Sequence, residues 1–383
     1  MKRLVFPSLG LAFGLAFVTA CGQDRAAPTP IRFLHTFGAE ETEVFNATMA
    51  ERGIAVESSL VPFARGQQVI SEILRAGNAC PDLIRIDATW LPGFVAAKLL
   101  APVPANLAQG DWLPEAVALA TPPGDNQVAA LPETVDGLFV LRDDAAPPPA
   151  SASIADLVAA TQAVQHPGRP HPLGLRVDGY WLVPWLRAEG ADLAVGKIDD
   201  DGAVRAITSF AGLFGTLVPP PPSAGDEAPD ELRRWGGHEI AYWVTGPWQV
   251  GALRDREHLA ASPLARAPRG GQLLVVPACA QNPAAGWRLA GELTSVEVER
   301  KFAEKFASVP TRQAALAAAP PLVRQIHDAL SATEMLPRSP LTPLLFDDLN
   351  PALDAVVGGD ATPEEVVEGV RRGWRRLESR AYP

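Results

Sequence analysis

The chain has 383 residues, of which 47% are hydrophobic and 20% are charged, and its formal net charge at pH 7 is −11. This apolar content excludes a disordered chain. The acidic balance argues against nucleic acid as a partner, because nucleic-acid binding selects basic patches. The length exceeds what one hydrophobic core usually serves, so we expect two domains.

The first twenty residues have the order of an export signal. Two basic residues and an apolar run over 4–18 are followed by small residues before Cys21. The run is shorter than the roughly 20 apolar residues that span a bilayer, which favours a signal peptide over 1–20. The motif "VTAC" resembles the bacterial lipobox, in which the cysteine is lipidated; the alternative is an ordinary signal with a chance cysteine. Residues 21–30 are small and polar, which suits a lipidated, flexible tether.

Lipidation of Cys21 would leave two other cysteines, Cys80 and Cys279. In an exported protein such a pair can form a disulfide. The alternative, two unrelated buried thiols, stays open on the residues alone.

The chain then alternates between strand and helix patterns. Period-two apolar residues predict strands over 31–37, 54–62 and 81–88. Helical spacing predicts a helix after each strand, with Gly53 and Gly77 ending the first two. This order predicts an α/β fold with a parallel sheet covered by helices on both faces.

The middle of the chain contains a candidate crossing between domains. "QVAALPETVDGLFVL" (127–141) predicts two short strands interrupted at Pro132. Further strands are expected over 173–177, 239–245 and 271–278. Further helices are expected over 179–193 and 204–218, after the caps Ser153, Asn282 and Thr362, and around Val298, Phe302 and Phe306.

An aromatic segment, "HEIAYWVTGPWQV" (238–250), surrounds a Gly-Pro break. The pattern predicts that Ile240, Tyr242 and Val244 share one face of a strand and that Trp243 lies on the other. Pro247 then starts a helix that carries Trp248. These aromatic residues are either core packing or a stacking surface beside a ligand cleft.

Short catalytic motifs are missing from the sequence. It contains no phosphate-binding loop, Gly-x-Ser-x-Gly, Cys-x-x-Cys or Gly-x-Gly-x-x-Gly motif. "HEIAY" lacks the second histidine of a zinc protease, because Tyr242 stands there. We therefore predict no catalytic residues, no cofactor and no metal site, although a carboxylate pair drawn from distant segments could still form an enzyme site.

Five segments in order resemble the extracellular solute-binding proteins of sugar ABC importers, the maltose-binding-like group. They are "FLHTFGAEETEVFNATM", "PDLIRIDATWLPGFVAAKLLAPV", "VAALPETVDGLFVL", "YWVTGPWQVGAL" and "SVPTRQAAL". The resemblance implies the class II periplasmic-binding-protein fold, in which crossover hinge strands join two lobes. Lobe 1 would comprise 31–133 and 272–325, and lobe 2 would comprise 134–271 and 326–383. Because the family's return strand runs antiparallel beside strand three, the resemblance also implies a Cys80–Cys279 disulfide.

The resemblance also implies a site. In the family the tryptophan of the Gly-Pro-Trp turn stacks on a sugar ring, which points to Trp248, and hydroxyl groups require polar side chains around it. The aromatic candidates are Trp248, Trp243, Trp90 and Trp181. The polar candidates are His35, Glu40, Asp87, Glu133, Asp136 and Arg312. Each has a rival role: packing for the tryptophans, helix capping for Asp87, a favourable helix N-terminus for Glu40 and an ion pair for Arg312.

The resemblance thus predicts a substrate-binding lipoprotein, exported and anchored at the periplasmic or cell-surface side of a membrane. It would be a monomer that delivers a carbohydrate, such as the α-glucoside disaccharides trehalose or maltose, to separate ABC permease subunits. The alternatives are a non-sugar ligand, either a polyamine or a chelated metal, a signalling subunit, and a carbohydrate-active enzyme.

Overall fold

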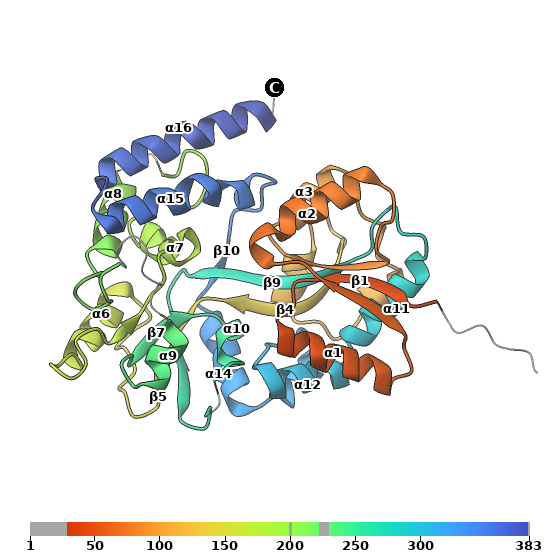
Figure 1. The fold of residues 1–383 in the computed structure, drawn as a ribbon, viewed down its shortest axis with the longest axis horizontal. Coiled ribbons are helices and arrows are strands. Elements are labelled where there is room, and N and C mark those ends of the chain that lie inside the picture. The colour runs from red at the N-terminus through yellow and green to blue at the C-terminus, as the bar shows by residue number, and fades with distance from the viewer. Residues whose placement is uncertain (1–28, 199–200, 222–229, 254, 382–383) are drawn as a thin grey trace, which may run out of the picture.

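The computed structural model describes residues 29–198, 201–221, 230–253 and 255–381. The expected signal peptide, Cys21 and most of the tether therefore lie outside the described residues. The described chain forms two α/β bodies side by side, connected through β4 (Leu131–Gly137), β9 (Pro268–Val275) and β10 (Glu334–Met335) (Figure 1).

The first sheet has the strand order β10-β9-β3-β1-β2, and β4 pairs with β9. As predicted, β1 (Ile31–His35) is parallel to β2 (Val56–Leu60) and to β3 (Leu83–Asp87). β9 returns antiparallel to β3, which is the arrangement that the family resemblance implied.

Helices cover both faces of this sheet, because their apolar residues recur at helical spacing and are buried against it. One face is covered by α1 (Ala39–Glu51), α11 (Pro283–Leu293) and α12 (Val296–Phe306). The other is covered by α2 (Phe63–Ala76), α3 (Leu91–Ala96) and α5 (Pro114–Ala120). Gly77 ends α2 in the left-handed conformation, at φ 68°. The short helices α4 (Ala105–Ala108) and α13 (Gln313–Ala317) complete this body.

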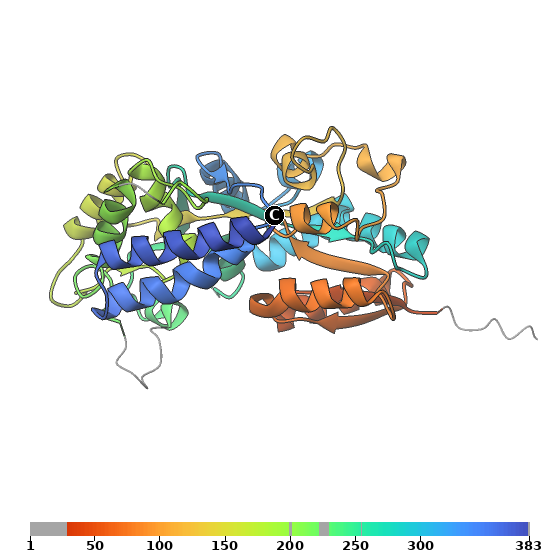
Figure 2. The same ribbon diagram turned by 90° about the horizontal axis from the view of Figure 1, so that it is seen from above.

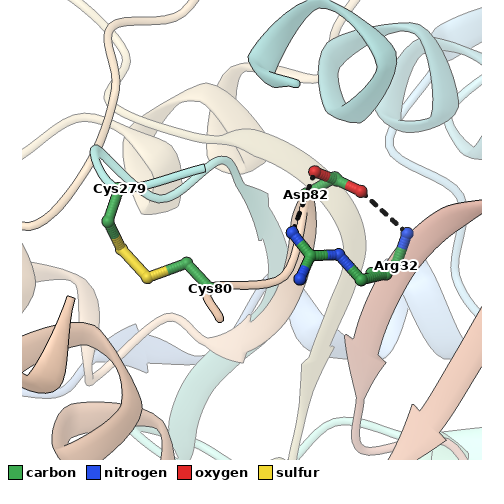
Figure 3. The surroundings of a disulfide bond; sticks show 4 residues. All are labelled: Arg32, Cys80, Asp82 and Cys279. Atoms are coloured by element: carbon green, nitrogen blue, oxygen red, sulfur yellow. Dashed lines mark hydrogen bonds and ion pairs between the residues drawn. A yellow bond between two sulfur atoms is a disulfide. The ribbon is translucent and has the colours of Figure 1, made fainter. Parts of the chain in front are cut away.

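A disulfide joins Cys80 to Cys279 across 199 residues of sequence (Figure 3). It connects the segment before β3 to the segment after β9. Beside it, Asp82 accepts a hydrogen bond of 2.9 Å from the backbone of Arg32 and forms an ion pair with its guanidinium. The start of β3 is therefore fixed to both neighbouring strands.

The second sheet has the order β6-β7-β5-β8. Its strands are β5 (Phe139–Asp143), β6 (Leu173–Gly174), β7 (Tyr242–Thr245) and β8 (Leu259–Ser262). One face packs against the helices α6 (Ile154–Ala163), α7 (Gly179–Ala188), α8 (Asp201–Ala211), α15 (Leu345–Gly358) and α16 (Pro363–Ala381). The turn η1 (Thr342–Leu344) leads into α15, and α15 and α16 run side by side (Figure 2). Each predicted cap, Ser153, Asn282 and Thr362, accepts a hydrogen bond from the first turn of its helix.

Several expectations about local structure were wrong. The helix expected over 179–193 ends at Ala188, and the strand expected over 173–177 ends at Gly174. β4 runs through Pro132, where the strand has a register irregularity, and the break before β5 falls at Leu138 instead. Ile240 packs in the same cluster as Trp243 rather than with Tyr242, because regular pairing of β7 begins only at Tyr242. Helix α8 ends at Ala211, where turns containing Gly212 and Gly215 follow.

The two bodies share an apolar seam on one side. It contains side chains of β7, β8 and α12 together with α9 (Glu231–Gly236), α10 (Pro247–Val250) and α14 (Pro321–Leu330). Arg256 donates hydrogen bonds to the carbonyl oxygens of Glu304 and Lys305 at the end of α12, and also to that of Gly251. The segment after α10 is therefore attached to the first body. In the part of the chain that the structure describes, no helix has the length and apolarity needed to cross a membrane.

Candidate functional site

Polar side chains gather where β3, β4 and β9 pass from one body toward the other. Asp87 ends β3 and lies opposite Gln272 of β9, whose Nε2 donates to Asp87 Oδ2 at 3.3 Å. Asp87 Oδ1 also accepts hydrogen bonds from the backbone and the hydroxyl of Thr89, at 2.8 and 2.5 Å. Asp136 of β4 lies nearby, where Gln272 and Asp87 both influence its pKa. The carboxyl end of β3 therefore holds two carboxyl groups together.

A buried ion pair between Arg85 and Glu133 lies next to these carboxyl groups. Arg85 Nε donates to Glu133 Oε2 at 2.8 Å, and Nη1 donates to Thr36 Oγ1 at 2.9 Å. The guanidinium also lies over the ring of Phe37, 4.5 Å from its centroid. Burial raises the pKa of Glu133, and Arg85 opposes this effect. Glu133 is therefore buried in the first body and paired with Arg85.

Burial raises the pKa values of both aspartates and of a tyrosine from the second body. Burial, followed by the charge of Asp87, raises the pKa of Asp136 to about 7. Burial also raises the pKa of Asp87. Tyr180, in the first turn of α7, lies beside Asp136: a methyl group on Gly270 would stand 2.7 Å from Asp136 Oδ1 and 3.4 Å from the tyrosine hydroxyl. Burial raises the pKa of Tyr180, as do the charges of Asp136 and Asp87.

The Gly-Pro-Trp turn adds an exposed ring to this group. Trp248 is 45% exposed, and its ring centroid lies 6.4 Å from Tyr180 and 6.2 Å from Trp181. A side chain at Gly246 would overlap the indole, so the six-membered part of the ring lies close to the backbone of that glycine. Trp181 is buried and donates its Nε1 hydrogen to the carbonyl of Val244. We define the junction site as Asp87, Asp136, Gln272, Tyr180 and Trp248.

A second aromatic pair lies at the same edge of the first sheet. Trp90 follows β3 and is 5% exposed, and the ring of Phe63, at the start of α2, stacks 5.4 Å from it. Sequence reasoning missed Phe63 and Tyr180. The sequence held a signal for both. Phe63 lies three residues after a strand and Tyr180 lies at the start of a helix. In an α/β sheet, such positions face the carboxyl edge.

Four predicted residues lie apart from the junction site. Trp243 is buried with its ring 6.0 Å from that of Trp235. His35 is buried among phenylalanine rings, and burial, with a smaller effect of Arg85, lowers its pKa to about 4. Arg312 pairs with Asp111 and lies over the ring of Trp112. Glu40 is exposed in the first turn of α1. In this structure the first three make ring contacts or an ion pair away from the junction site.

Two other observations delimit the site. Within the described ranges, no three histidine, cysteine, aspartate or glutamate side chains are arranged to hold a metal ion. A cavity of about 420 Å³ lies between β1, β2 and the last turns of α2, and its lining includes Glu57, Glu72 and Asn78. None of the candidate ligand-binding residues lines it.

Two α/β sheets joined by crossing strands, with polar and aromatic side chains gathered at the crossing, define a two-lobed periplasmic-binding-protein fold. The GacH receptor of Streptomyces glaucescens, solved unliganded and with acarbose, has a TM-score of 0.79 at 23% identity, covering 91% of this chain and 98% of its own. Maltose-bound MalE3 of T. maritima has a TM-score of 0.77 at 19% identity, covering 91% and 100%. MalX from Streptococcus pneumoniae, in complex with maltopentaose, has a TM-score of 0.73 at 16% identity, covering 91% and 100%.

The family model of bacterial extracellular solute-binding proteins matches residues 43–326. The chain belongs to this family. No curated protein matches it.

Proposed function

We propose that this protein binds a carbohydrate between its two lobes and delivers it to the permease of an ABC importer. One observation carries the proposal: the half-exposed indole of Trp248 lies beside Tyr180, and Tyr180 in turn lies beside the carboxyl group of Asp136 and is influenced by the charge of Asp87. The similar folds bound to acarbose, maltose and maltopentaose support it.

The chemistry of the junction site suits a sugar. A pyranose has apolar C–H faces and a rim of hydroxyl groups, so it requires a flat aromatic surface with polar groups at the edge. Trp248 supplies the surface, and Asp87 and Asp136 accept hydrogen bonds from hydroxyls. A hydrogen bond to a charged group contributes about 1.5–3 kcal/mol net. Nothing in this set requires a bond to be made or broken, so we propose binding without catalysis.

Ligand binding would act through lobe closure. We propose that lobe 1 (31–133 and 272–325) and lobe 2 (134–271 and 326–383) rotate about the crossing strands, with the ligand binding the closed state better. The division is supported by the two separate sheets, since β4 and β5 belong to different sheets and are separated by a single residue, Leu138.

We further propose export and anchoring through Cys21, which rest on the lipobox-like sequence "VTAC". A lipidated Cys21 with more than one acyl chain would hold the protein stably at the periplasmic or cell-surface side of a membrane. The protein would act as a monomer, with permease and ATPase as separate chains.

A thermal-shift screen against glucose, maltose, trehalose, maltotriose and maltotetraose tests this function, because a ligand that binds the folded state raises the unfolding midpoint. We expect at least one sugar to raise it. Trp248→Ala should abolish the shift with little change in the apo midpoint, since the ring is half exposed, and Trp248→Tyr should retain part of it.

Three outcomes would contradict the proposal. A shift with spermidine or a divalent metal alone would assign a non-sugar ligand. Cleavage of the sugar during incubation would assign an enzyme. A large loss of the apo midpoint in Trp248→Ala would show that the ring belongs to the core.

A further inference from the structure

The first sheet has a free edge at β2. This strand is last in the order β10-β9-β3-β1-β2, and among the described strands it pairs with β1 alone. Backbone hydrogen bonds that join β1 to Ala55 and Val61 bound this parallel ladder. Because alternate residues of a strand bond to opposite sides, the amide and carbonyl groups of Val56, Ser58 and Leu60 point to the outer edge. A row of hydrogen-bonding groups is therefore open to a further strand.

A groove lies beside this edge. It is the cavity of about 420 Å³ between the sheet and the last turns of α2. Glu57 and Ser59 line it from β2, and Glu72, Ile73 and Ala76 line it from α2. Strand side chains alternate between the two faces, so Glu57 and Ser59 lie on the face toward α2, on either side of the outward backbone groups of residue 58. The groove and the open edge form one continuous surface.

The groove carries negative charge on both of its walls. Glu57 and Glu72 are exposed and come from different elements. Within the described ranges, no cation pairs with either carboxylate, and Glu72 accepts a hydrogen bond of 3.1 Å from the neutral amide of Gln68. Arg32 also lines the groove, but Asp82 balances its charge. A positively charged side chain would therefore be favoured between the two walls.

We propose that an extended, basic segment of a partner protein adds to β2 as a further strand. Its backbone would pair with the outer edge of β2, as in strand addition to other open sheets. Its lysine or arginine side chains on the face toward α2 would place their charges between Glu57 and Glu72 and their apolar stems against Ile73. None of the candidate sugar-binding residues lines the groove, so this surface is separate from the junction site.

The charge also argues against a second copy of this chain as the occupant. Pairing two β2 strands edge to edge would bring together two strands that each carry Glu57. Like charges on facing strands destabilise the pairing, whereas a basic segment neutralises the carboxylates. The charge of the edge and of its groove therefore favours a partner of the opposite sign.

Fluorescence anisotropy with a labelled peptide tests the proposal. The probe is a blocked peptide of about seven residues in which lysine and valine alternate, a length that matches an ordinary strand. The full chain should bind it at least ten-fold more tightly than a peptide with glutamate in place of lysine. A lysine peptide in which proline replaces the central valines keeps its charge but cannot pair as a strand. It should bind at least ten-fold more weakly as well.

Variants of β2 separate strand addition from simple charge attraction. Ser58→Pro removes one outward amide and should weaken the lysine–valine peptide by about ten-fold, because this amide does not bond to β1. Ser58→Ala is the matched control: both variants lose the hydrogen bond from Ser58 Oγ to Asn46, but alanine keeps the amide and should bind like wild type. Circular dichroism and the unfolding midpoint of each variant show whether it is folded.

The acidic walls are tested by the double variant Glu57→Gln/Glu72→Gln. It should weaken the peptide by about ten-fold and reduce the dependence of binding on salt, since fewer charges are then paired. Glu364→Gln removes an exposed carboxylate from α16 and should change neither.

Three results would overturn the proposal. The first is wild-type protein that does not bind the lysine–valine peptide. The second is equal binding of that peptide and its proline-containing version, which would show charge attraction without strand pairing. The third is self-association of the wild-type chain that Ser58→Pro abolishes, measured by sedimentation equilibrium, which would make a second copy the occupant of the edge.

Discussion

At the scale of single residues, Asp136 couples stability to pH. Its pKa in the folded protein is raised to about 7 from an ordinary value of 3.8, mainly by burial. The protonated carboxyl group is therefore favoured in the folded state. Its contribution to stability is fully present below about pH 4 and is lost as the pH rises through about 7, at about 1.4 kcal/mol for each unit of pKa difference.

We therefore expect Asp136→Asn, which cannot ionise, to gain thermal stability relative to wild type as the pH rises from 5 to 8. Unfolding midpoints of both proteins across this range provide the measurement. A difference in midpoints that does not change with pH would show that Asp136 ionises normally in the folded protein.

Arg85 and Glu133 form the second residue-scale case. Both are buried, and removal of one partner leaves the other uncompensated. Arg85→Met should destabilise the protein by about 3–5 kcal/mol at pH 8, and by less at pH 5, where Glu133 can take up a proton. The double variant Arg85→Met/Glu133→Gln should recover part of the loss. Denaturant unfolding of the three proteins measures the coupling, and additive losses would contradict it.

At the scale of elements, the Gly-Pro-Trp turn sets the position of an indole. Gly246 has an ordinary extended φ of −114°, so alanine fits its backbone. The three heavy atoms nearest to the added methyl group would all belong to the ring of Trp248. Gly246→Ala should therefore weaken sugar binding ten-fold or more while leaving the unfolding midpoint within a few degrees.

Gly369→Ala is the matched control, since a methyl group at that position of α16 contacts nothing. It should leave binding unchanged. If Gly246→Ala bound sugar like wild type, the placement of the indole would be unimportant.

The elements also show what could be predicted from sequence. The βαβ order, the glycine end of α2 and the caps of Ser153, Asn282 and Thr362 follow from local chemistry and were confirmed. We expected the crossing strand to break at Pro132, but the break lies at Leu138. The strand continues through Pro132 because a proline can be accommodated at a bulge.

The candidate site was less predictable. Trp248 could be singled out because its turn is a local motif. An ion pair was already an alternative for Arg312, and it pairs with Asp111, which lies far along the chain. The burial of His35 among phenylalanine rings was not foreseen. Phe63 and Tyr180 were missed because their ring neighbours, Trp90 and Trp248, lie far along the chain.

At the scale of the whole molecule, the disulfide links two segments that are far apart in the sequence. It joins Cys80 to Cys279, 199 residues apart, and so connects the two separate parts of the first body. Under denaturing conditions without reductant, a variant that begins after Cys21 should show no reactive thiols, and reduction should release two. Replacing both cysteines by serine should cost about 2–4 kcal/mol. Two thiols before reduction would contradict the pairing.

The apolar seam has a consequence for how the lobes can move. The segment carrying Trp248 is fastened at Gly251 and Arg256 to the end of α12, so it lies beside the pivot of any rotation that keeps the seam intact. β2 is three strands away from β9, a lever arm of about 14 Å. A rotation of about 10° would then carry the tip of β2 through about 2.4 Å while the indole stays almost still. In the proposed closure, the edge of the first sheet that carries β2 would therefore approach an indole that stays almost in place.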